Sequence, residues 1–420
     1  MKIMVVGGGG REHAIIKKIK QNPTVDEIYA LPGNGGIEED AICVPIGAKD
    51  IEKITEFAVN NKINYAIVAP DDPLVLGAVD ALNKAGIACF GPTADAAIIE
   101  GSKVFSKNLM KKYGIPTAQY ETFSDMESAL KFVENCKLPT VVKADGLALG
   151  KGVIIAETRE EAMLAVRSIM EDKIFGKSGN NIVIEEFLTG PEVSVLAFCD
   201  GKTVVPMISA MDNKRVGDND TGLNTGGMGA IAPNPFYTED VAIRCNKEIF
   251  LPTVNAMQKE NRPFKGCLYF GLMITPDGPK VIEYNCRFGD PETQAVLPLL
   301  KSDLLTVMQA VTNGTLDKVN VEFYDKASCC VVVASNGYPQ KYQTGYTLTI
   351  PQCDDGEVYV AGAKKEDGVL KTSGGRVAGA VAVADSLEEA IEKAYKITDE
   401  IKFENKYFRT DIGRKVLKRN

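Results

Sequence analysis

A glycine-rich turn separates two β-rich runs at residues 141–153, which have the sequence VVKADGLALGKGV. Lys143 ends the first apolar run, and a hairpin containing Gly146, Gly150 and Gly152 follows it. A loop without side chains can lie close over a triphosphate and can move as a lid. The alternative is a simple glycine hairpin beside a surface lysine. A lysine embedded in an apolar run is difficult to leave solvated, so we favour a nucleotide-phosphate site.

The same stretch nearly matches a Walker A phosphate-binding loop. Gly146 and Gly150 are one residue too close together for that motif, and Gly152 stands where a Ser or Thr should bind Mg²⁺. The sequence therefore excludes a Walker A site.

Short apolar strands alternate with helical segments over the first hundred residues. We expect strands at 2–6, 28–31, 65–69 and 88–90, and helices at 11–20, 51–60 and 74–85. Repeated β-α-β units with short connections predict a parallel, doubly wound sheet. Ligands bind such sheets beyond the carboxyl ends of the strands, which here are followed by the segments 7–10, 32–36 and 70–73.

The turn at 7–10 has the sequence GGGG and is followed by REH. It fails the dinucleotide fingerprint in both registers, because Glu12 and His13 stand where the last glycine should be. Leu31 and Pro32 also replace the acidic residue expected at the end of the second strand. A helix N-terminus after such a turn can still hold one phosphate, whereas the alternative is a tight strand-to-helix connection. We favour phosphate binding over both that alternative and NAD.

The remaining chain predicts further α+β structure. Two capping boxes, Ser124 with Glu127 and Thr158 with Glu161, predict helix starts. Strands are expected at 140–143, 153–156, 182–186, 193–198, 271–274, 280–284, 327–334 and 378–384, and a helix begins after Ser386. We expect three domains: residues 1–103, residues 104–320 with a small mobile lobe at about 120–190 and a central lobe at 191–320, and residues 321–420.

Three polar side chains alternate at the end of the strand-like run KVIEYNCR, residues 280–287. Glu283, Asn285 and Arg287 share one face of an extended chain. A carboxylate and an amide oxygen suit Mg²⁺, which usually takes one or two protein carboxylates and fills its other positions with phosphate and water. An arginine can bind a carboxylate or phosphate through its planar fork. We expect this strand to lie beside the one that carries Lys143.

A long polar segment, DNKRVGDNDTG at 212–222, precedes a second glycine-rich stretch at 226–229. A loop of this length inside a compact protein is usually functional or disordered. Mixed charges with scattered glycines favour a binding loop over a linker.

The composition excludes several classes of protein. The chain of 420 residues has a formal net charge of −8, which disfavours nucleic acid as the main partner. Its single histidine, His13, excludes a multi-histidine metal site. Ten cysteines without CxxC pairs indicate a reducing compartment, and no apolar run approaches the ~18 residues that a membrane span needs. We expect a cytoplasmic protein that does not bind membranes.

Taken in order, these segments resemble the ATP-grasp ligases, and within them the glycinamide ribonucleotide synthetase family. The matching stretches include GGREHA (9–14), PGN (32–34), FGPTADAA (90–97), EGSK (100–103), VVKADGLALGKGV (141–153), IEEFLTGPEVS (184–194), DNKRVGDNDTGLNTGGMGA (212–230), IEYNCRFGDPETQ (282–294), GGRV (374–377) and FRTDIG (408–413). The resemblance implies an ATP-grasp fold with an N-terminal doubly wound parallel α/β domain and a small C-terminal α+β domain. It also implies a ligase that uses ATP to join glycine to 5-phosphoribosylamine through a glycyl phosphate in purine biosynthesis.

The resemblance implies a role for individual residues of this chain. ATP would contact Lys103, Lys143, the lid glycines Gly146, Gly150 and Gly152, the adenine-facing Glu185, Glu186, Phe187 and Leu188, and Glu192 at the ribose. Glu283 and Asn285 would hold Mg²⁺ or Mn²⁺. Glycine and the acyl phosphate would contact Asp212, Lys214, Gly227 and Arg287, and the phosphoribosyl group would meet Gly9, Asn34 and Asp71. Of these, Lys143, Asp212 and Arg287 would be catalytic.

The sequence departs from the family at three places. Asp71 stands where glutamate is usual, Leu223 stands where proline is common, and the run 271–273 lacks an aspartate that many wider ATP-grasp enzymes use as a metal ligand. Two alternatives stay open, namely a related purine-pathway ligase for another small carboxylate and a non-catalytic nucleotide-binding protein. We expect a monomer or a weak dimer.

Overall fold

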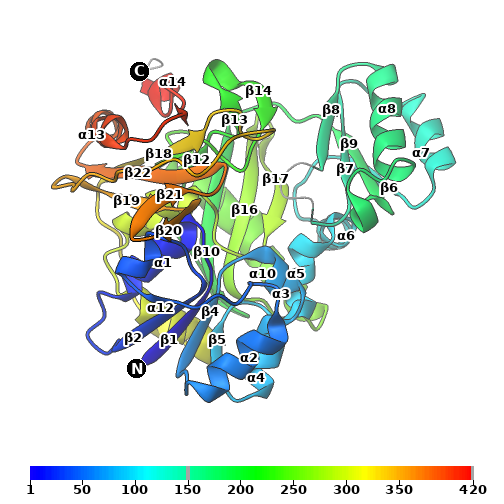
Figure 1. Ribbon diagram of the computed structural model, residues 1–420. Helices are drawn as coiled ribbons and strands as arrows, with labels where there is room; N and C mark the ends of the chain where they lie inside the picture. Colours follow the sequence, from blue (N-terminus) through cyan, green and yellow to red (C-terminus); the bar gives the residue numbers. More distant parts are fainter. Residues whose placement is uncertain (148–151, 418–420) are drawn as a thin grey trace.

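A five-stranded parallel sheet forms the N-terminal part of the structure, a computed structural model that describes residues 1–147 and 152–417 (Figure 1). Its strand order is β3-β2-β1-β4-β5. The strands are β1 (Lys2–Gly7), β2 (Glu27–Pro32), β3 (Ile42–Cys43), β4 (Tyr65–Val68) and β5 (Ala88–Phe90), and the helices are α1 (Gly10–Ile19), α2 (Ile51–Asn60), α3 (Asp71–Val75), α4 (Ala78–Lys84) and α5 (Ala94–Gly101). The predicted doubly wound sheet is confirmed. Its order reverses between β1 and β4, which places the ligand-binding edge of this sheet type at the turns after Gly7 and Val68.

Two local helix predictions are wrong. The helix expected over 74–85 is interrupted by Gly77, whose φ of +87° is a left-handed conformation that glycine adopts without strain, so α3 and α4 are separate. The helix α7 (Met126–Val133) begins at Asp125, whose carboxylate accepts from the Ser128 N–H at 2.8 Å. An aspartate next to the predicted Ser124 is an equally good N-cap, and it takes that role.

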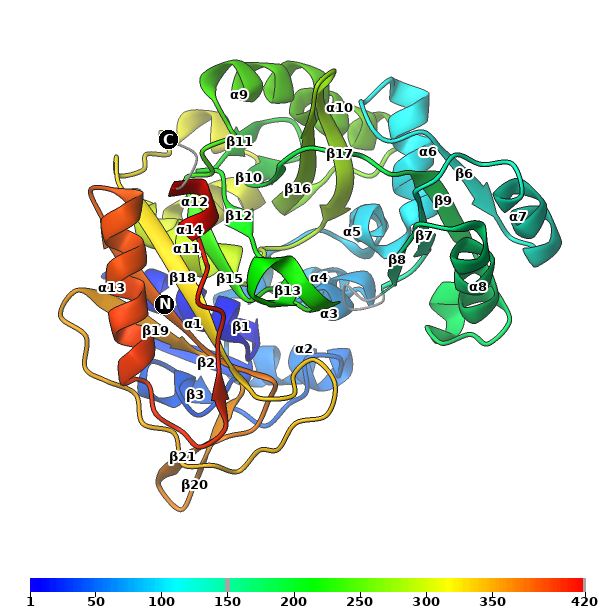
Figure 2. The same ribbon diagram turned by 90° about the horizontal axis from the view of Figure 1, so that it is seen from above.

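A four-stranded antiparallel sheet, β6-β9-β7-β8, forms a small lobe with its own apolar core. It comprises β6 (Tyr120–Phe123), β7 (Thr140–Ala144), β8 (Val153–Ala156) and β9 (Ile182–Glu186), with α7 and α8 (Arg159–Met170). The capping box of Thr158 and Glu161 is present at the start of α8. Figures 1 and 2 show this lobe standing to one side of the molecule, next to α6 (Lys103–Tyr113).

The central sheet has the order β11-β10-β16-β17 and shares its core with the N-terminal sheet. Its strands are β10 (Glu192–Asp200), β11 (Val204–Pro206), β16 (Lys265–Thr275) and β17 (Gly278–Asn285), and the helices nearby are α9 (Glu239–Cys245), α10 (Leu251–Lys259) and α12 (Leu304–Asn313). Val195 and Leu196 point to opposite faces of β10, and each joins a core that also contains residues of β1. The central sheet is therefore fixed to the N-terminal sheet through side chains on both of its faces.

The third large sheet has the order β12-β15-β18-β22-β19, with β23 added to β18. It comprises β12 (Met211–Asp212), β15 (Gly229–Ala232), β18 (Ala327–Ser335), β19 (Gly356–Val360), β22 (Arg376–Ala384) and β23 (Lys406–Tyr407). Helix α13 (Leu387–Glu400) packs on it, and the Ser386 hydroxyl caps that helix as expected (Figure 2). The smaller elements are the hairpins β13 (Arg215–Gly217) with β14 (Thr221–Asn224) and β20 (Ala363–Glu366) with β21 (Val369–Thr372), and the helices α11 (Glu292–Val296) and α14 (Arg414–Leu417).

The polar segment at 212–229 is more ordered than a long loop. It contains the β13–β14 hairpin, and strands at its two ends join the C-terminal sheet. Arg409 is fully buried and binds both oxygens of Asp411 at 2.8 Å and Oδ1 of Asp220 at 2.9 Å. This guanidinium from the end of the chain holds the hairpin, which local sequence could not indicate.

Within residues 1–147 and 152–417, none of the helices has both the length and the apolar character required to cross a membrane.

Candidate active site

Glu283 lies near the end of β17, in a group of four cationic side chains. Its carboxylate is 31% exposed, and Oε1 lies 3.8 Å from Nζ of Lys214. Burial raises the pKa of Glu283, but the positive charges of Lys214, Lys143, Lys103 and Arg287 outweigh burial and hold that pKa below its ordinary value. Glu283 is therefore ionised at neutral pH, and it is accessible to a further cation.

Lys143 reaches this group from the small lobe. Its Nζ donates to the backbone oxygen of Ile282 at 3.3 Å and forms an ion pair with Glu185. Lys143 and Glu283 do not lie on neighbouring strands of one sheet, as the sequence analysis expected, because β7 belongs to the lobe and β17 to the central sheet. The amine of Lys143 reaches β17, the edge strand of the central sheet, at the carbonyl of Ile282, the residue before Glu283.

Glu185, on β9, holds two buried lysines. Its carboxylate pairs with both Lys143 and Lys107, and all three side chains are at most 5% exposed. Burial raises the pKa of Glu185, but the two ammonium groups lower it further, so the carboxylate stays charged. Burial lowers the pKa of Lys107 to about 8 despite the opposing effect of Glu185. The Glu185 side chain therefore positions Lys107 and Lys143.

Lys107 was missed by the sequence reasoning. It follows Lys103 by four residues on α6, so both lysines lie on one face of that helix. That spacing was the signal that could have identified it.

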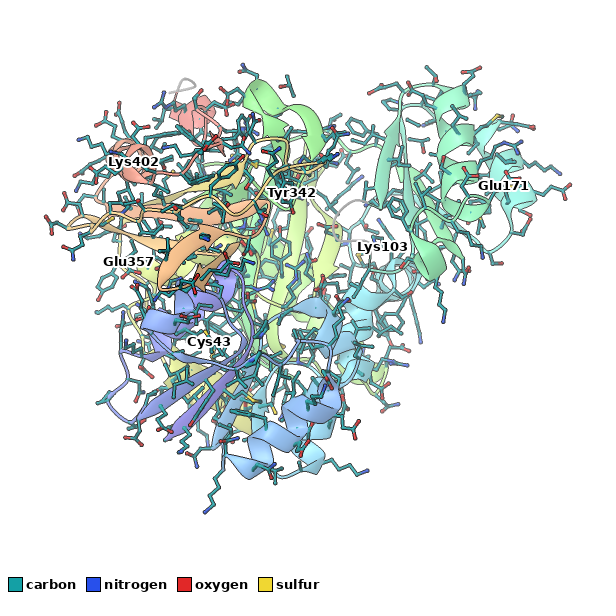
Figure 3. The ribbon with its side chains drawn as sticks, viewed as in Figure 1. Cys43, Lys103, Glu171, Tyr342, Glu357 and Lys402 are labelled. Carbon is teal, nitrogen blue, oxygen red and sulfur yellow. The ribbon has the colours of Figure 1, made fainter. Side chains whose placement is uncertain are left out.

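The other predicted ATP contacts surround the same region. Lys103, labelled in Figure 3, lies on α6 where the small lobe meets the rest of the chain, and its Nζ donates to the Gly146 carbonyl at 3.0 Å. Gly150 lies outside the described residues. The carbonyl of Gly152 accepts from the Ala144 N–H at 2.9 Å, and the carboxylate of Glu186 accepts from the Gln119 N–H at 3.0 Å. Phe187 is exposed and Leu188 is half-buried. Glu192 forms an ion pair with Lys214 at 3.3 Å.

Arg287 follows β17 and connects Asn285, a predicted metal ligand, to Glu100 of the N-terminal domain. Its Nη2 donates to Oδ1 of Asn285 at 3.0 Å and pairs with Oε1 of Glu100 at 3.1 Å. Glu100 was not predicted, and its second oxygen accepts from the Cys286 N–H at 2.7 Å. Nε of Arg287 is buried without a hydrogen-bond partner among the described residues. One donor of the guanidinium is thus unused.

The fit of Glu283 and Asn285 to a divalent ion follows from their donor atoms. An ionised carboxylate and an amide oxygen are hard ligands of the type that Mg²⁺ and Mn²⁺ prefer. In the described part of the chain, no group of three or more His, Cys, Asp or Glu side chains could hold a metal. The two residues therefore fit an ion whose remaining ligands come from nucleotide phosphates and water.

Asp212 lies on β12 with an unsatisfied carboxylate. Its Oδ1 is buried and has no hydrogen-bond partner among the described residues. Gly227 packs against it, since a Cβ at that glycine would lie 2.7 Å from Oδ1. Two residues further along the chain, Lys214 bridges Glu192 and Glu283, and Glu192 is the main reason that the pKa of this lysine is raised.

The residues predicted to contact the phosphoribosyl group have different surroundings in the structure. The Asn34 amide donates to the carbonyls of Gly8 and Val360 at 2.9 and 2.8 Å, and its oxygen accepts two backbone N–H groups, so this side chain shapes the loop. A Cβ at Gly9 would lie 3.5 Å from Oδ2 of Asp290. Burial lowers the pKa of Arg287, but the charges of Glu100 and then of Asp71 outweigh burial and raise it.

Arg376 supplies a contact from the C-terminal sheet that the sequence reasoning also missed. Its Nη1 donates to the carbonyls of Gly226 and Asp290 at 2.8 Å, and its Nη2 lies 3.3 Å from Oδ2 of Asp290. One guanidinium thus connects the turn beside Gly227 to the turn after β17. The matching stretch GGRV at 374–377 was the available signal.

Comparison with known proteins gives matches along nearly the whole chain. Models of the phosphoribosylglycinamide synthetase family match in three parts: the N domain at residues 1–100, the ATP-grasp (A) domain at 101–293 and the C domain at 328–415. A phosphoribosylamine–glycine ligase of Caldanaerobacter subterraneus subsp. tengcongensis is 48% identical, over 98% of this chain and 99% of its own length. A bifunctional purine biosynthetic protein of Pichia angusta is also 48% identical over 100% of this chain, which spans only 54% of that relative.

Among solved structures, the crystal structure of the phosphoribosylamine–glycine ligase of Thermotoga maritima superposes with a TM-score of 0.87. It is 32% identical and the match covers 98% of this chain and 100% of that one. The ATP-grasp architecture expected from the sequence is confirmed by this similarity together with the family models.

Proposed function

The chain belongs to the phosphoribosylglycinamide synthetase family, and from that premise we propose that it joins glycine to 5-phosphoribosylamine at the expense of ATP. The products are glycinamide ribonucleotide, ADP and phosphate, as in de novo purine biosynthesis. The observation that carries the proposal is the reach of Lys143 from the small lobe to Ile282, beside the ionised Glu283.

The cation group suits the first chemical step. A carboxylate is a poor electrophile, so ATP must first convert glycine to an acyl phosphate. Phosphoryl transfer depends on positioning and charge neutralisation more than on a protein nucleophile. Lys103, Lys143, Lys214 and Arg287 bring positive charge to one place, where a triphosphate and the glycine carboxylate would otherwise repel each other. We assign Lys103 and Lys143 to the ATP phosphates, and Arg287 with Lys214 to the carboxylate and the acyl phosphate.

Glu283 and Asn285 are the residues that would hold Mg²⁺ or Mn²⁺. A divalent ion between phosphate oxygens supplies further neutralisation of the transferred group. In the structure, Asn285 already accepts a hydrogen bond from Arg287, so one guanidinium orients the amide oxygen.

The second step is attack by the phosphoribosylamine nitrogen on the acyl carbon, with phosphate leaving. We assign the phosphoribosyl group to the edge of the N-terminal sheet, at Gly9, the loop shaped by Asn34, and Asp71. Asp71 supports this placement because its charge, after that of Glu100, contributes to the raised pKa of Arg287. The glycines at 146 and 152, the segment at 185–188 and Glu192 are assigned to ATP.

The proposal extends to the organisation of the protein. We place the domain boundaries near residues 103 and 320, with a lobe at about 120–190. The protein would work as a monomer or weak dimer in the cytoplasm, with small molecules as its substrates.

The direct test is release of phosphate from ATP by the purified protein in the presence of Mg²⁺, glycine and freshly generated 5-phosphoribosylamine. We expect ATP consumption to require glycine and to yield glycinamide ribonucleotide in equal amount, detected by mass spectrometry. Turnover that is indifferent to glycine, or that bicarbonate or formate supports in its place, would contradict the proposal. Nucleotide binding without turnover would identify a binding protein instead.

A further inference from the structure

Asp145, which directly follows β7 in the small lobe, is bound to the start of α6. Its Oδ1 accepts two hydrogen bonds at 2.8 Å, one from the Ser102 hydroxyl and one from the Val104 N–H. Its backbone oxygen accepts from the Lys103 N–H at 2.9 Å. Three consecutive residues at the beginning of the helix therefore donate to one aspartate of the lobe.

These contacts complete the N-terminal cap of α6. The first N–H groups of a helix have no partner within the helix itself. The Ser102 hydroxyl accepts from the Phe105 N–H at 3.0 Å, and the same hydroxyl donates to Asp145. The Val104 N–H is satisfied by the Asp145 carboxylate, and negative charge at this end of a helix is favourable. Asp145 thus acts as a second cap that comes from another part of the chain.

Asp145 is also fixed within its own lobe. Its N–H donates to the carbonyls of Ser178 and Asn181 at 3.0 and 3.1 Å, and the Asn181 amide donates to its Oδ2 at 3.4 Å. The Ser178 hydroxyl donates to the carbonyl of Leu147, two residues further along, at 3.0 Å. The position of Asp145 is therefore set by the lobe, and α6 is bound to it.

The start of α6 carries Lys103, one of the two lysines assigned to the ATP phosphates. Its Nζ donates to the carbonyl of Gly146, the residue after Asp145, at 3.0 Å. The other lysine, Lys143, precedes Asp145 by two residues and lies on β7. Asp145 thus joins the helix that carries Lys103 to the strand that carries Lys143, and this link sets how the two side chains lie relative to each other.

Glu185 joins the same helix to the same strand at a second point. It pairs with Lys107 on α6 and with Lys143 on β7. Lys107 lies about one helical turn beyond Lys103, so the contact that fixes the N-terminal end of α6 to the lobe is the one made by Asp145. A displacement of about 1 Å at a group that positions a substrate can cost about 10²-fold in rate.

We propose that Asp145 is a positioning residue for ATP, which fixes Lys103 relative to Lys143 so that both ammonium groups meet one phosphate chain. Both carboxylate oxygens of Asp145 accept from protein groups, so the residue acts through Lys103 rather than by binding the nucleotide. This inference rests on the function proposed above and adds to it the residue that sets the geometry of its two phosphate lysines.

The first test compares Asp145→Ala with Asp145→Asn in an assay of glycine-dependent ADP formation. Asp145→Ala removes the acceptor of the Ser102 and Val104 hydrogen bonds and should lower kcat/KM for ATP about 30-fold, mainly through KM, while KM for glycine changes by less than about threefold. Asp145→Asn keeps an oxygen that accepts the same two bonds and should stay within about threefold of the wild type. A purely structural role would affect the two substrates alike.

The second test repeats Asp145→Ala in the Lys103→Met background. If Asp145 acts through Lys103, its loss should lower kcat/KM for ATP by less than about threefold once Lys103 is already gone, because the two changes remove the same interaction. Losses that multiply would overturn the inference.

Asp125→Ala is the matched control within the same lobe. Asp125 caps α7 by accepting from the Ser128 N–H at 2.8 Å, so its loss also removes a helix cap. It should lower the melting temperature as Asp145→Ala does and leave KM for both ATP and glycine unchanged.

Ser102→Ala removes one of the two donors to Oδ1 of Asp145, and it carries both tests if Asp145→Ala does not fold, judged by its melting curve. A folded variant with the wild-type KM for ATP, or with equal increases of KM for ATP and glycine, would overturn the inference while leaving the proposed ligase intact. A wild-type protein that never consumes ATP with glycine would overturn the proposed function, and this inference with it.

Discussion

Glu283→Gln should lower kcat/KM for glycine-dependent ADP formation by about 10³-fold at ordinary Mg²⁺ concentrations. The substitution keeps the shape of the side chain but removes the negative charge on which four cations act and that would bind the divalent ion. Part of the loss should be recovered at high Mn²⁺ concentration, because a neutral amide still offers an oxygen ligand. The measurement is a coupled ADP assay with titrated metal.

Glu171→Gln is the control for that loss of charge. This glutamate is 56% exposed, far from Lys103 on the outer side of the small lobe, and its replacement should leave the rate unchanged (Figure 3). Activity of Glu283→Gln within about threefold of the wild type at ordinary Mg²⁺ would remove Glu283 from the metal site.

Lys143→Met should have two separable effects. It removes a phosphate contact, so kcat/KM for ATP should fall by about 10²-fold to 10³-fold. It also leaves Glu185 buried with Lys107 as its one remaining ion-pair partner among the described residues, which should lower the free energy of unfolding by about 3 kcal/mol. Activity assays and denaturant unfolding measure the two effects independently.

The double variant Lys143→Met/Glu185→Gln distinguishes these effects. Removing the charge of Glu185 should restore most of the stability lost in Lys143→Met, because no uncompensated carboxylate is left buried. It should restore none of the activity. Lys84→Met, on an exposed position of α4, is the matched control and should change neither quantity. Recovery of activity in the double variant would mean that Lys143 acts only through the fold.

Local patterns in the sequence were sufficient for much of the fold. Strand β1, which is buried from its second residue onward, and its neighbours have apolar runs separated by glycine turns, which is typical of a parallel sheet covered on both faces, and that sheet is present. The cap at Asp125 was missed because the adjacent Ser124 could equally have filled that role, and the break at Gly77 was missed because an isolated glycine is tolerated inside a helical pattern. The hairpin at 215–224 was missed because Arg409, almost two hundred residues away, holds it.

In the candidate site too, local patterns predicted some residues, whereas contacts between distant parts of the chain could not be predicted. Glu283, Asn285 and Arg287 could be grouped because they alternate on one strand, and Lys143 because an apolar strand ends in glycines. No local pattern could show that Lys143 and Glu283 come from different sheets, or that Glu185 pairs with two lysines. Asp145 and Arg376 were missed for the same reason, since their partners come from distant parts of the chain.

The central claim is that Lys143 and Glu283 act together on the phosphate chain of one nucleotide, and a double-mutant cycle tests it most directly. Glycine-dependent kcat/KM for ATP is measured in the wild type, Lys143→Met, Glu283→Gln and the double variant. We predict that the double variant loses hardly more than the poorer single variant, because groups that stabilise the same transition state lose their effects together. Losses that multiply, so that the coupling energy stays below about 0.5 kcal/mol, would contradict the claim.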